Sequence, residues 1–206
     1  MPEFKSLLDG YRRFRTETYP AQRRRWETLA GGQEPPVMVI SCCDSRVDPA
    51  TVFDTEPGQA FILRNVANLV PPFEQGGGLH GASAAIEFAV IGLEVRHIVV
   101  LGHGACGGVA AALSGADLGA PGQSFIDDWV AILREARDRV IASGCEDCQH
   151  ALELEAVKVS LANLRTFPWL KAREEQGLLK LHGAYFAIAD GVLHLLDEAS
   201  GEFAPA

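Results

Sequence analysis

Two short polar stretches, each directly after an apolar run, constrain this chain more than any other feature. The apolar runs at 37–40 and 97–101 have the length and composition of buried parallel strands. The first run leads into Cys-Cys-Asp-Ser-Arg at 42–46, and the second leads into Gly-His-Gly-Ala-Cys-Gly at 102–107. Sites in open α/β sheets form outside the carboxyl ends of the strands, so we expect both stretches to lie at one edge of a sheet.

The side chains of these stretches have the chemistry of a zinc site. His103 and Cys106 are three residues apart, so one turn can direct both at an ion, and a cysteine from the first stretch completes the set. Spacing alone does not choose between Cys42 and Cys43. Asp44 lies two residues beyond Cys42 and shares its face in extended backbone, which favours Cys42. The alternative is an ordinary turn with cysteines as apolar filling.

Taken together, the two stretches resemble the signatures of the β-class carbonic anhydrases. The matching residues are Cys42-x-Asp44-Ser45-Arg46 and His103-x-x-Cys106-Gly107. The likeness extends over most of the chain and includes the segments 56–58, 64–68 and 81–87. It implies a homo-oligomer, a dimer at minimum, with the site near the subunit interface.

The resemblance also implies a reaction, the reversible hydration of CO2 to bicarbonate and a proton. One Zn²⁺ per chain would be held by Cys42, His103 and Cys106, and zinc hydroxide would attack CO2. Arg46 would keep Asp44 ionised, so that Asp44 accepts a hydrogen bond from the hydroxide and orients it. The alternatives are a turn-stabilising Asp44–Arg46 pair, or Asp44 as a fourth zinc ligand. Two thiolates should leave activity rising through mildly alkaline pH.

Five further positions are candidates for substrate binding. By resemblance, Gln33 matches a glutamine that hydrogen-bonds substrate or product, and Phe61, Val66 and Phe88 match an apolar pocket for CO2. Phe88 stands where some members of the family have tyrosine, and core packing is the alternative for all three apolar residues. Gly107 begins a helix whose free N–H groups suit an anion such as bicarbonate.

The resemblance separates two subtypes of the family. Some bacterial members have a closed state in which the aspartate ligates zinc, and this state uses a tryptophan and a tyrosine. The corresponding positions are Val39 and Phe186 here, although Arg64 is retained. The sequence therefore resembles the permanently open, bacterial subtype.

Two other functions remain open at this point. A relative on the same scaffold could hydrolyse carbonyl sulfide or carbon disulfide with nearly the same site. A non-catalytic zinc or redox module is the third possibility, although such a site needs no Asp44–Arg46 pair.

Composition limits the class of protein. The chain has 206 residues and 48% hydrophobic residues, which suits one domain over 1–206. No apolar run has the length of a membrane span, and no signal peptide is visible, so we expect a cytoplasmic protein. A net charge of −9 argues against nucleic acid as a partner. Five cysteines argue against a disulfide framework, so Cys145 and Cys148 are expected to be free thiols, with a second metal or a redox pair as the alternative.

The fold predicted from these patterns is α/β, a mainly parallel sheet flanked by helices. A helical arm at 1–30 precedes the first strand and is expected to pack on a partner subunit. Asp190-Gly191 is a strong hairpin signal near the C-terminus. The remaining expected elements are strands at 60–64, 178–187 and 192–196 and helices at 80–93, 124–143 and 146–166.

Overall fold

The computed structural model describes residues 3–74, 80–115 and 124–206. The chain divides into two compact units, Met1–Glu34 and Pro35–Ala206. The boundary falls in segment 31–36, whose glycine and proline residues are typical of a loop.

The first unit is helical, as the sequence predicts. Its elements are α1 (Phe4–Arg13), a π-helical segment (Phe14–Thr18), α2 (Tyr19–Ala21) and α3 (Arg23–Leu29). Trp26 packs edge-on against Phe14 and stacks on Tyr19, with ring centroids 5.7 and 6.2 Å apart. These three rings hold the helical segments of the unit together. The apolar stripe of α1 is exposed, with Phe4 at 74% and Leu7 at 62%.

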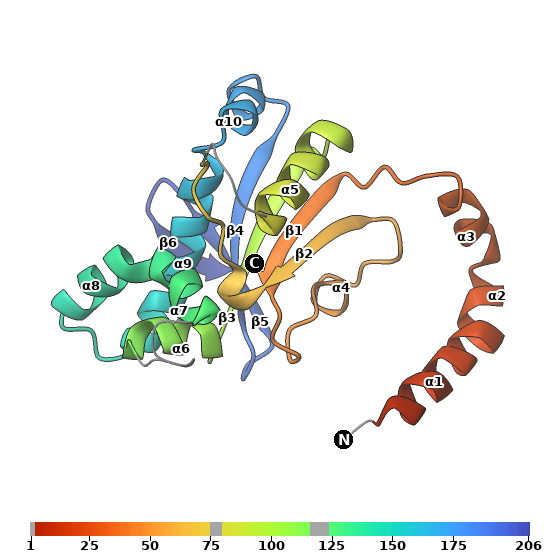
Figure 1. Ribbon diagram of the computed structural model, residues 1–206, viewed down its shortest axis with the longest axis horizontal. Helices are drawn as coiled ribbons and strands as arrows, with labels where there is room; N and C mark the ends of the chain where they lie inside the picture. Colours follow the sequence, from red (N-terminus) through yellow and green to blue (C-terminus); the bar gives the residue numbers. More distant parts are fainter. Residues whose placement is uncertain (1–2, 75–79, 116–123) are drawn as a thin grey trace. The chain divides into compact units, whose positions relative to one another are not determined.

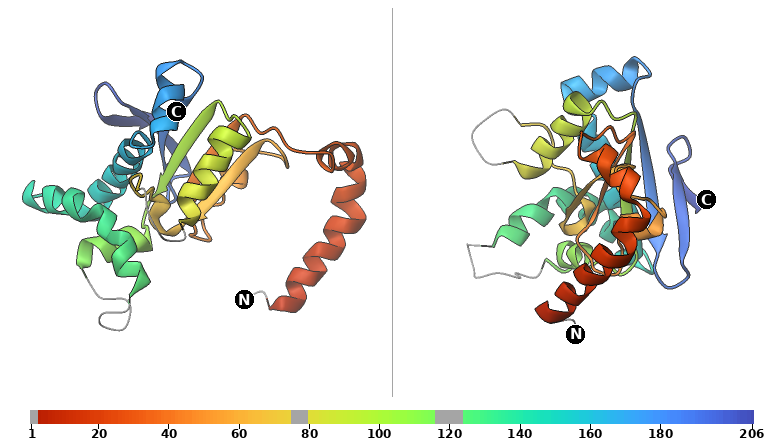
Figure 2. Two further views of the ribbon diagram at one scale, coloured as in Figure 1. Left: turned by 45° about the horizontal axis from the view of Figure 1, so that its top comes forward. Right: turned by 90° about the vertical axis from the view of Figure 1, so that its right-hand side faces the viewer.

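The second unit is built around a six-stranded sheet of order β2-β1-β3-β4-β5-β6 (Figure 1). The strands are β1 (Val37–Cys42), β2 (Ala60–Asn65), β3 (His97–His103), β4 (Lys180–Ala187), β5 (Val192–Asp197) and β6 (Glu202–Pro205). The first four strands pair in parallel, whereas β5 and β6 add antiparallel to the edge at β4 (Figure 2). The mainly parallel sheet and the C-terminal hairpin are thereby confirmed.

The helices of this unit follow the predicted pattern with interruptions. They are α4 (Pro49–Val52), α5 (Gly81–Glu87), α6 (Gly107–Ser114), α7 (Phe125–Val130), α8 (Arg134–Ala142), α9 (Cys148–Leu164) and α10 (Pro168–Glu175). Shorter segments are a π-helix at Phe88–Gly92 and 3₁₀ turns at Val66–Asn68 and Ala131–Leu133. The expected helix at 124–143 is therefore split, and α4, α10 and β6 were not expected. Within the described ranges, no helix is both long and apolar enough to cross a membrane.

The two faces of the sheet carry different cores. Met38 and Ile40 of β1 point with Ile98 of β3 into a cluster formed with α5 and α9. Val39 and Leu101 face the other way, toward Val52 of α4. This alternation puts Cys42, the residue that ends β1, on the same face as Met38 and Ile40. Because β1 and β3 are neighbours, the two polar stretches begin side by side.

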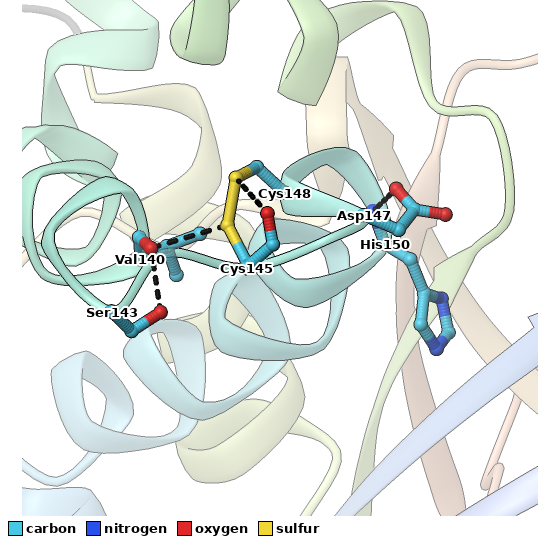
Figure 3. The surroundings of a disulfide bond; sticks show 6 residues. All are labelled: Val140, Ser143, Cys145, Asp147, Cys148 and His150. Carbon is cyan, nitrogen blue, oxygen red and sulfur yellow. Dashed lines mark hydrogen bonds between the residues drawn. A yellow bond between two sulfur atoms is a disulfide. The ribbon is translucent and has the colours of Figure 1, made fainter.

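Cys145 and Cys148 form a disulfide between α8 and α9 (Figure 3), so the expectation of two free thiols was wrong. Gly144, with φ of 69°, ends α8 in the left-handed conformation and turns the chain. The turn leaves the two Cα atoms 5.2 Å apart, within the range that a disulfide spans. Cys42, Cys43 and Cys106 are free.

Removing this disulfide should lower stability moderately. Closing a loop of four residues restricts the unfolded chain by about 2 kcal/mol in the chain-entropy model. We therefore expect the double variant Cys145→Ser/Cys148→Ser to lose about that much free energy of unfolding in a urea titration. Cys43→Ser, which removes an exposed free thiol, is the control. Equal unfolding midpoints for the double variant and the control would contradict the prediction.

Candidate metal centre

The carboxyl ends of β1 and β3 bring Cys42, His103 and Cys106 together. All three residues are buried, and their ligand atoms lie within 4.8 Å of one another. Cys42 ends β1, His103 ends β3, and Cys106 is the N-cap residue of α6. Cys43 is exposed, so it does not share this cluster. Side-chain alternation along the strand thus places Cys42, and not Cys43, in the cluster.

The geometry of the cluster fits a tetrahedral zinc ion. Two thiolates bound to one such ion at about 2.3 Å have their sulfurs roughly 3.8 Å apart. The Sγ atoms of Cys42 and Cys106 are 3.9 Å apart. The His103 Nδ1 atom lies 2.9 Å from the Gly104 carbonyl oxygen. Its Nε2 atom is buried without a hydrogen-bond partner in the described part of the chain, as a metal-ligating nitrogen requires.

The two thiols influence each other strongly. A hydrogen bond from Cys106 lowers the pKa of Cys42, and the contact with Cys42, together with burial, raises the pKa of Cys106. The pKa values of the two thiols shift in opposite directions because ionising one makes it harder to ionise the other. Two thiolates at this distance in a buried site repel each other. A divalent cation between the sulfurs removes that repulsion, so the donor set favours a metal.

Asp44 and Arg46 form a two-point ion pair beside the cluster. The Nε and Nη2 atoms of Arg46 donate to the two carboxylate oxygens of Asp44 at 2.9 and 2.6 Å. The Arg46 backbone N–H donates to Oδ1 at 2.9 Å. These bonds hold the pKa of Asp44 well below its usual range. Nη2 also donates to the Ala105 carbonyl at 2.9 Å, so Arg46 links the two stretches.

The sequence comparisons agree with this geometry. The family model described as "Carbonic anhydrase" matches residues 37–193, which include all three clustered residues and the ion pair.

This chain belongs to the carbonic anhydrase family that this model describes.

The members of the family that this chain resembles belong to the β class. The chain is 38% identical over 192 residues to "Beta carbonic anhydrase 5, chloroplastic" of Arabidopsis thaliana, a match that covers 91% of this chain. The match spans 62% of the length of that relative.

Solved β-carbonic anhydrases share the fold over nearly the whole chain. The β-carbonic anhydrase CcaA has a TM-score of 0.90 and 31% identity, and the match covers 98% of this chain and 91% of that one. A structure from a study of two tetrameric β-carbonic anhydrases of Sordaria macrospora has a TM-score of 0.81 and 29% identity. That match covers 94% of this chain and 96% of the other.

Arg64, in β2, donates hydrogen bonds to the backbone of the turn that contains Cys42 and Asp44. It donates to the backbone carbonyls of Cys42, Asp44 and Val47 at 2.9, 2.7 and 3.0 Å. One guanidinium thus fixes the turn that carries both a ligand and the carboxylate. The sequence offers no signal for this role, because backbone acceptors carry no side-chain pattern.

The metal cluster contacts the backbone of the 3₁₀ turn at Val66–Asn68, which follows β2. The Ala67 N–H donates to Cys42 Sγ at 3.4 Å, and Ala67 has a φ of 62°. A Cβ atom on Gly108 would lie 2.5 Å from Val66 Cγ1 and 3.0 Å from the Ala67 Cβ. Only glycine at 108 allows α6 to approach this segment.

Gly108→Ala should destabilise the protein, whereas Gly107→Ala should not. Overpacking of this kind costs about 1–3 kcal/mol. A Cβ on Gly107 meets no atom within 4 Å, and alanine is the better helix former, so that variant should be neutral or slightly stabilised. Thermal unfolding of the two variants measures the contrast. Equal melting temperatures would show that α6 can shift to accommodate the methyl group.

The remaining sequence candidates are not all brought together. Val66 packs against the core cluster that contains Cys42 and Cys106, and Gly107 directly follows the ligand Cys106. Phe61 contacts Phe88, with ring centroids 5.8 Å apart, but Phe61 lies beside Met38 near the start of β1, whereas the metal cluster lies at the ends of β1 and β3. Gln33 belongs to the first compact unit, Met1–Glu34.

Proposed function

We propose that this protein catalyses the reversible hydration of CO2 to bicarbonate and a proton with one Zn²⁺ per chain. The observation that carries the proposal is a buried set of two thiols and one imidazole, matched to zinc in spacing, beside the Asp44–Arg46 pair. Three protein ligands are the number that leaves a zinc ion one open position. Zinc in such a site is a Lewis acid that makes hydroxide available near neutral pH.

In this proposal Asp44 acts as an obligate hydrogen-bond acceptor. An ionised carboxylate has no proton to donate, so Asp44 can only accept a hydrogen bond from the nucleophilic oxygen. That bond fixes the orientation of the oxygen and leaves a lone pair free to meet the carbon of CO2. Arg46 serves by keeping Asp44 ionised and by setting its position through two side-chain bonds.

We propose further that the site belongs to the open subtype. Asp44 is held by three hydrogen bonds from Arg46, and leaving them for a metal would break all three. Arg64 is committed to three carbonyls of the same turn. Val39 and Phe186 replace the polar-tipped aromatic residues of the closed state, and both lie in or against an apolar cluster.

For the substrate, we propose a pocket of apolar and backbone groups. Val66, Phe61 and Phe88 offer the apolar surface that a small nonpolar gas prefers, while Gly107 offers backbone N–H groups to bicarbonate. Gln33 would hydrogen-bond substrate or product.

The assembly is proposed to be a dimer at minimum, with the helical arm packing on a partner subunit. The exposed stripe of α1 is apolar surface that such packing would remove from water. A cytoplasmic location is proposed because Cys42 and Cys106 must stay reduced to bind a metal, whereas the Cys145–Cys148 disulfide favours an oxidising compartment.

Stopped-flow CO2 hydration by the zinc-loaded protein at about pH 8.5 tests the proposal. We expect fast turnover that a chelator abolishes and zinc restores. Parallel assays with carbonyl sulfide distinguish the alternative substrate. Zinc bound at one per chain without CO2 turnover would contradict the proposed reaction.

A further inference from the structure

A buried carboxylate lies next to the metal cluster and contacts the backbone of Cys106. Glu153 of α9 is only 3% exposed and is the one buried acidic residue in the described part of the chain. Burying a carboxylate is costly unless its oxygens are hydrogen-bonded. Its position therefore calls for a role that an apolar residue of similar size could not fill.

Both oxygens of Glu153 are hydrogen-bonded, and one of them binds the backbone of a metal ligand. Oε1 accepts from the Cys106 N–H at 2.9 Å and from Gln149 Nε2 at 2.8 Å. Oε2 accepts from the Tyr185 hydroxyl at 3.0 Å. Gln149 Nε2 also donates to the Cys106 carbonyl at 3.0 Å. Two side chains of α9 thus hold the N–H and the C=O of Cys106.

The fold explains how these groups converge. Gln149 and Glu153 are four residues apart and so lie on one face of α9. Tyr185 reaches the same place from β4, and a Cβ on Gly104 would lie 3.0 Å from its hydroxyl. The Gly104 N–H in turn donates to the Phe186 carbonyl at 3.0 Å. The turn from His103 to Cys106 is therefore fixed by hydrogen bonds to α9 and β4.

We propose that Glu153 is the positioning residue for Cys106. The carboxylate fixes the Cys106 backbone, and thereby the direction of its Sγ, before a metal binds. Glu153 acts through the backbone and is not a ligand, because the ligand group consists of Cys42, His103 and Cys106. A ligand held in place loses less conformational freedom on binding, so the metal affinity rises. The inference rests on the metal site and not on the reaction, so it can fail or succeed independently of CO2 turnover.

Metal affinity of two matched variants tests the proposal. Glu153→Met keeps the size of the side chain and removes the acceptor, whereas Glu153→Gln keeps an oxygen that can accept from Cys106. Loss of groups that orient ligands typically weakens metal binding about 10–100-fold. We expect a loss in that range for Glu153→Met and a clearly smaller one for Glu153→Gln, measured by chelator competition. The absorption spectrum of the cobalt-substituted protein should change more in Glu153→Met.

The control is Leu164→Ala, at the far end of the same helix. Leu164 is fully buried against the sheet, so this variant should lose stability without losing metal affinity. Wild-type affinity in folded Glu153→Met, or an equal loss of affinity in Leu164→Ala, would overturn the proposal. If Glu153→Met fails to fold, the amide NMR signal of Cys106 in Glu153→Gln decides, because exchanging a charged acceptor for a neutral one must shift it. An unshifted signal would also overturn the inference.

Discussion

Replacing Arg46 with alanine is expected to lower CO2 hydration by about 10²-fold or more while zinc stays bound. The reason is geometric, since a misplaced catalytic group costs on the order of 10²-fold for a shift of 1 Å. Without the Arg46 guanidinium, Asp44 loses two hydrogen bonds, whereas the one from the backbone N–H of residue 46 is kept. The loop carbonyl of Ala105 loses its partner as well. Stopped-flow kinetics together with zinc content measure both parts of the prediction.

Arg46→Lys separates charge from geometry. Lysine keeps the positive charge but cannot bind both carboxylate oxygens in the planar arrangement that arginine provides. We expect this variant to recover only part of the lost activity. Near-normal turnover in Arg46→Ala, with zinc at one per chain, would mean that the pair merely stabilises a turn. Loss of zinc in the same variant would make Arg46 a structural support of the metal site.

The second large effect is expected from neighbouring cysteines. Cys42→Ser should lose bound zinc and, with it, nearly all activity, because serine replaces a buried thiolate by a hydroxyl that rarely ionises. Cys43→Ser should retain both, because Cys43 is exposed and outside the ligand group. Metal analysis of the two purified variants, followed by the hydration assay, measures the difference.

This pair is informative because the two residues share a backbone turn. Any general disturbance of the turn should affect both variants, so only a specific ligand role predicts opposite outcomes. Retention of zinc by Cys42→Ser at wild-type affinity would require a different ligand set. Full loss in both variants would indicate a folding defect and would leave no support for Cys42 as the single ligand from β1.

The sequence predicts the central strands and the metal cluster for clear physical reasons. The runs at 37–40 and 98–101 are apolar throughout because both faces of β1 and β3 are covered, by α5 and α9 on one side and partly by α4 on the other. Alternation along β1 then separates Cys42 from Cys43. Asp190-Gly191 marks the β4–β5 hairpin because Gly191 adopts a φ of 68°.

Other features depend on tertiary contacts that leave no local pattern. Glu153 sits in an ordinary helical sequence, and only packing places it against Cys106. The disulfide depends on the turn at Gly144 rather than on the number of cysteines. Strand β6 has four residues, too few for a periodic signal, and its position follows from pairing with β5. The tilted ring contact between Phe61 and Phe88 likewise joins residues from separate elements.

The position of the clustered residues at and just beyond the ends of two neighbouring strands has a consequence for folding. Cys42 and Cys106 are 64 residues apart in the chain, and an ion held between them acts as a cross-link that closes a long loop. Binding that occurs only in the native state adds to stability by mass action. The melting temperature should therefore rise with free zinc, and unfolding of the loaded protein should require the ion to leave. The supply of metal in the cell would then set how long each molecule survives, as well as how fast it works.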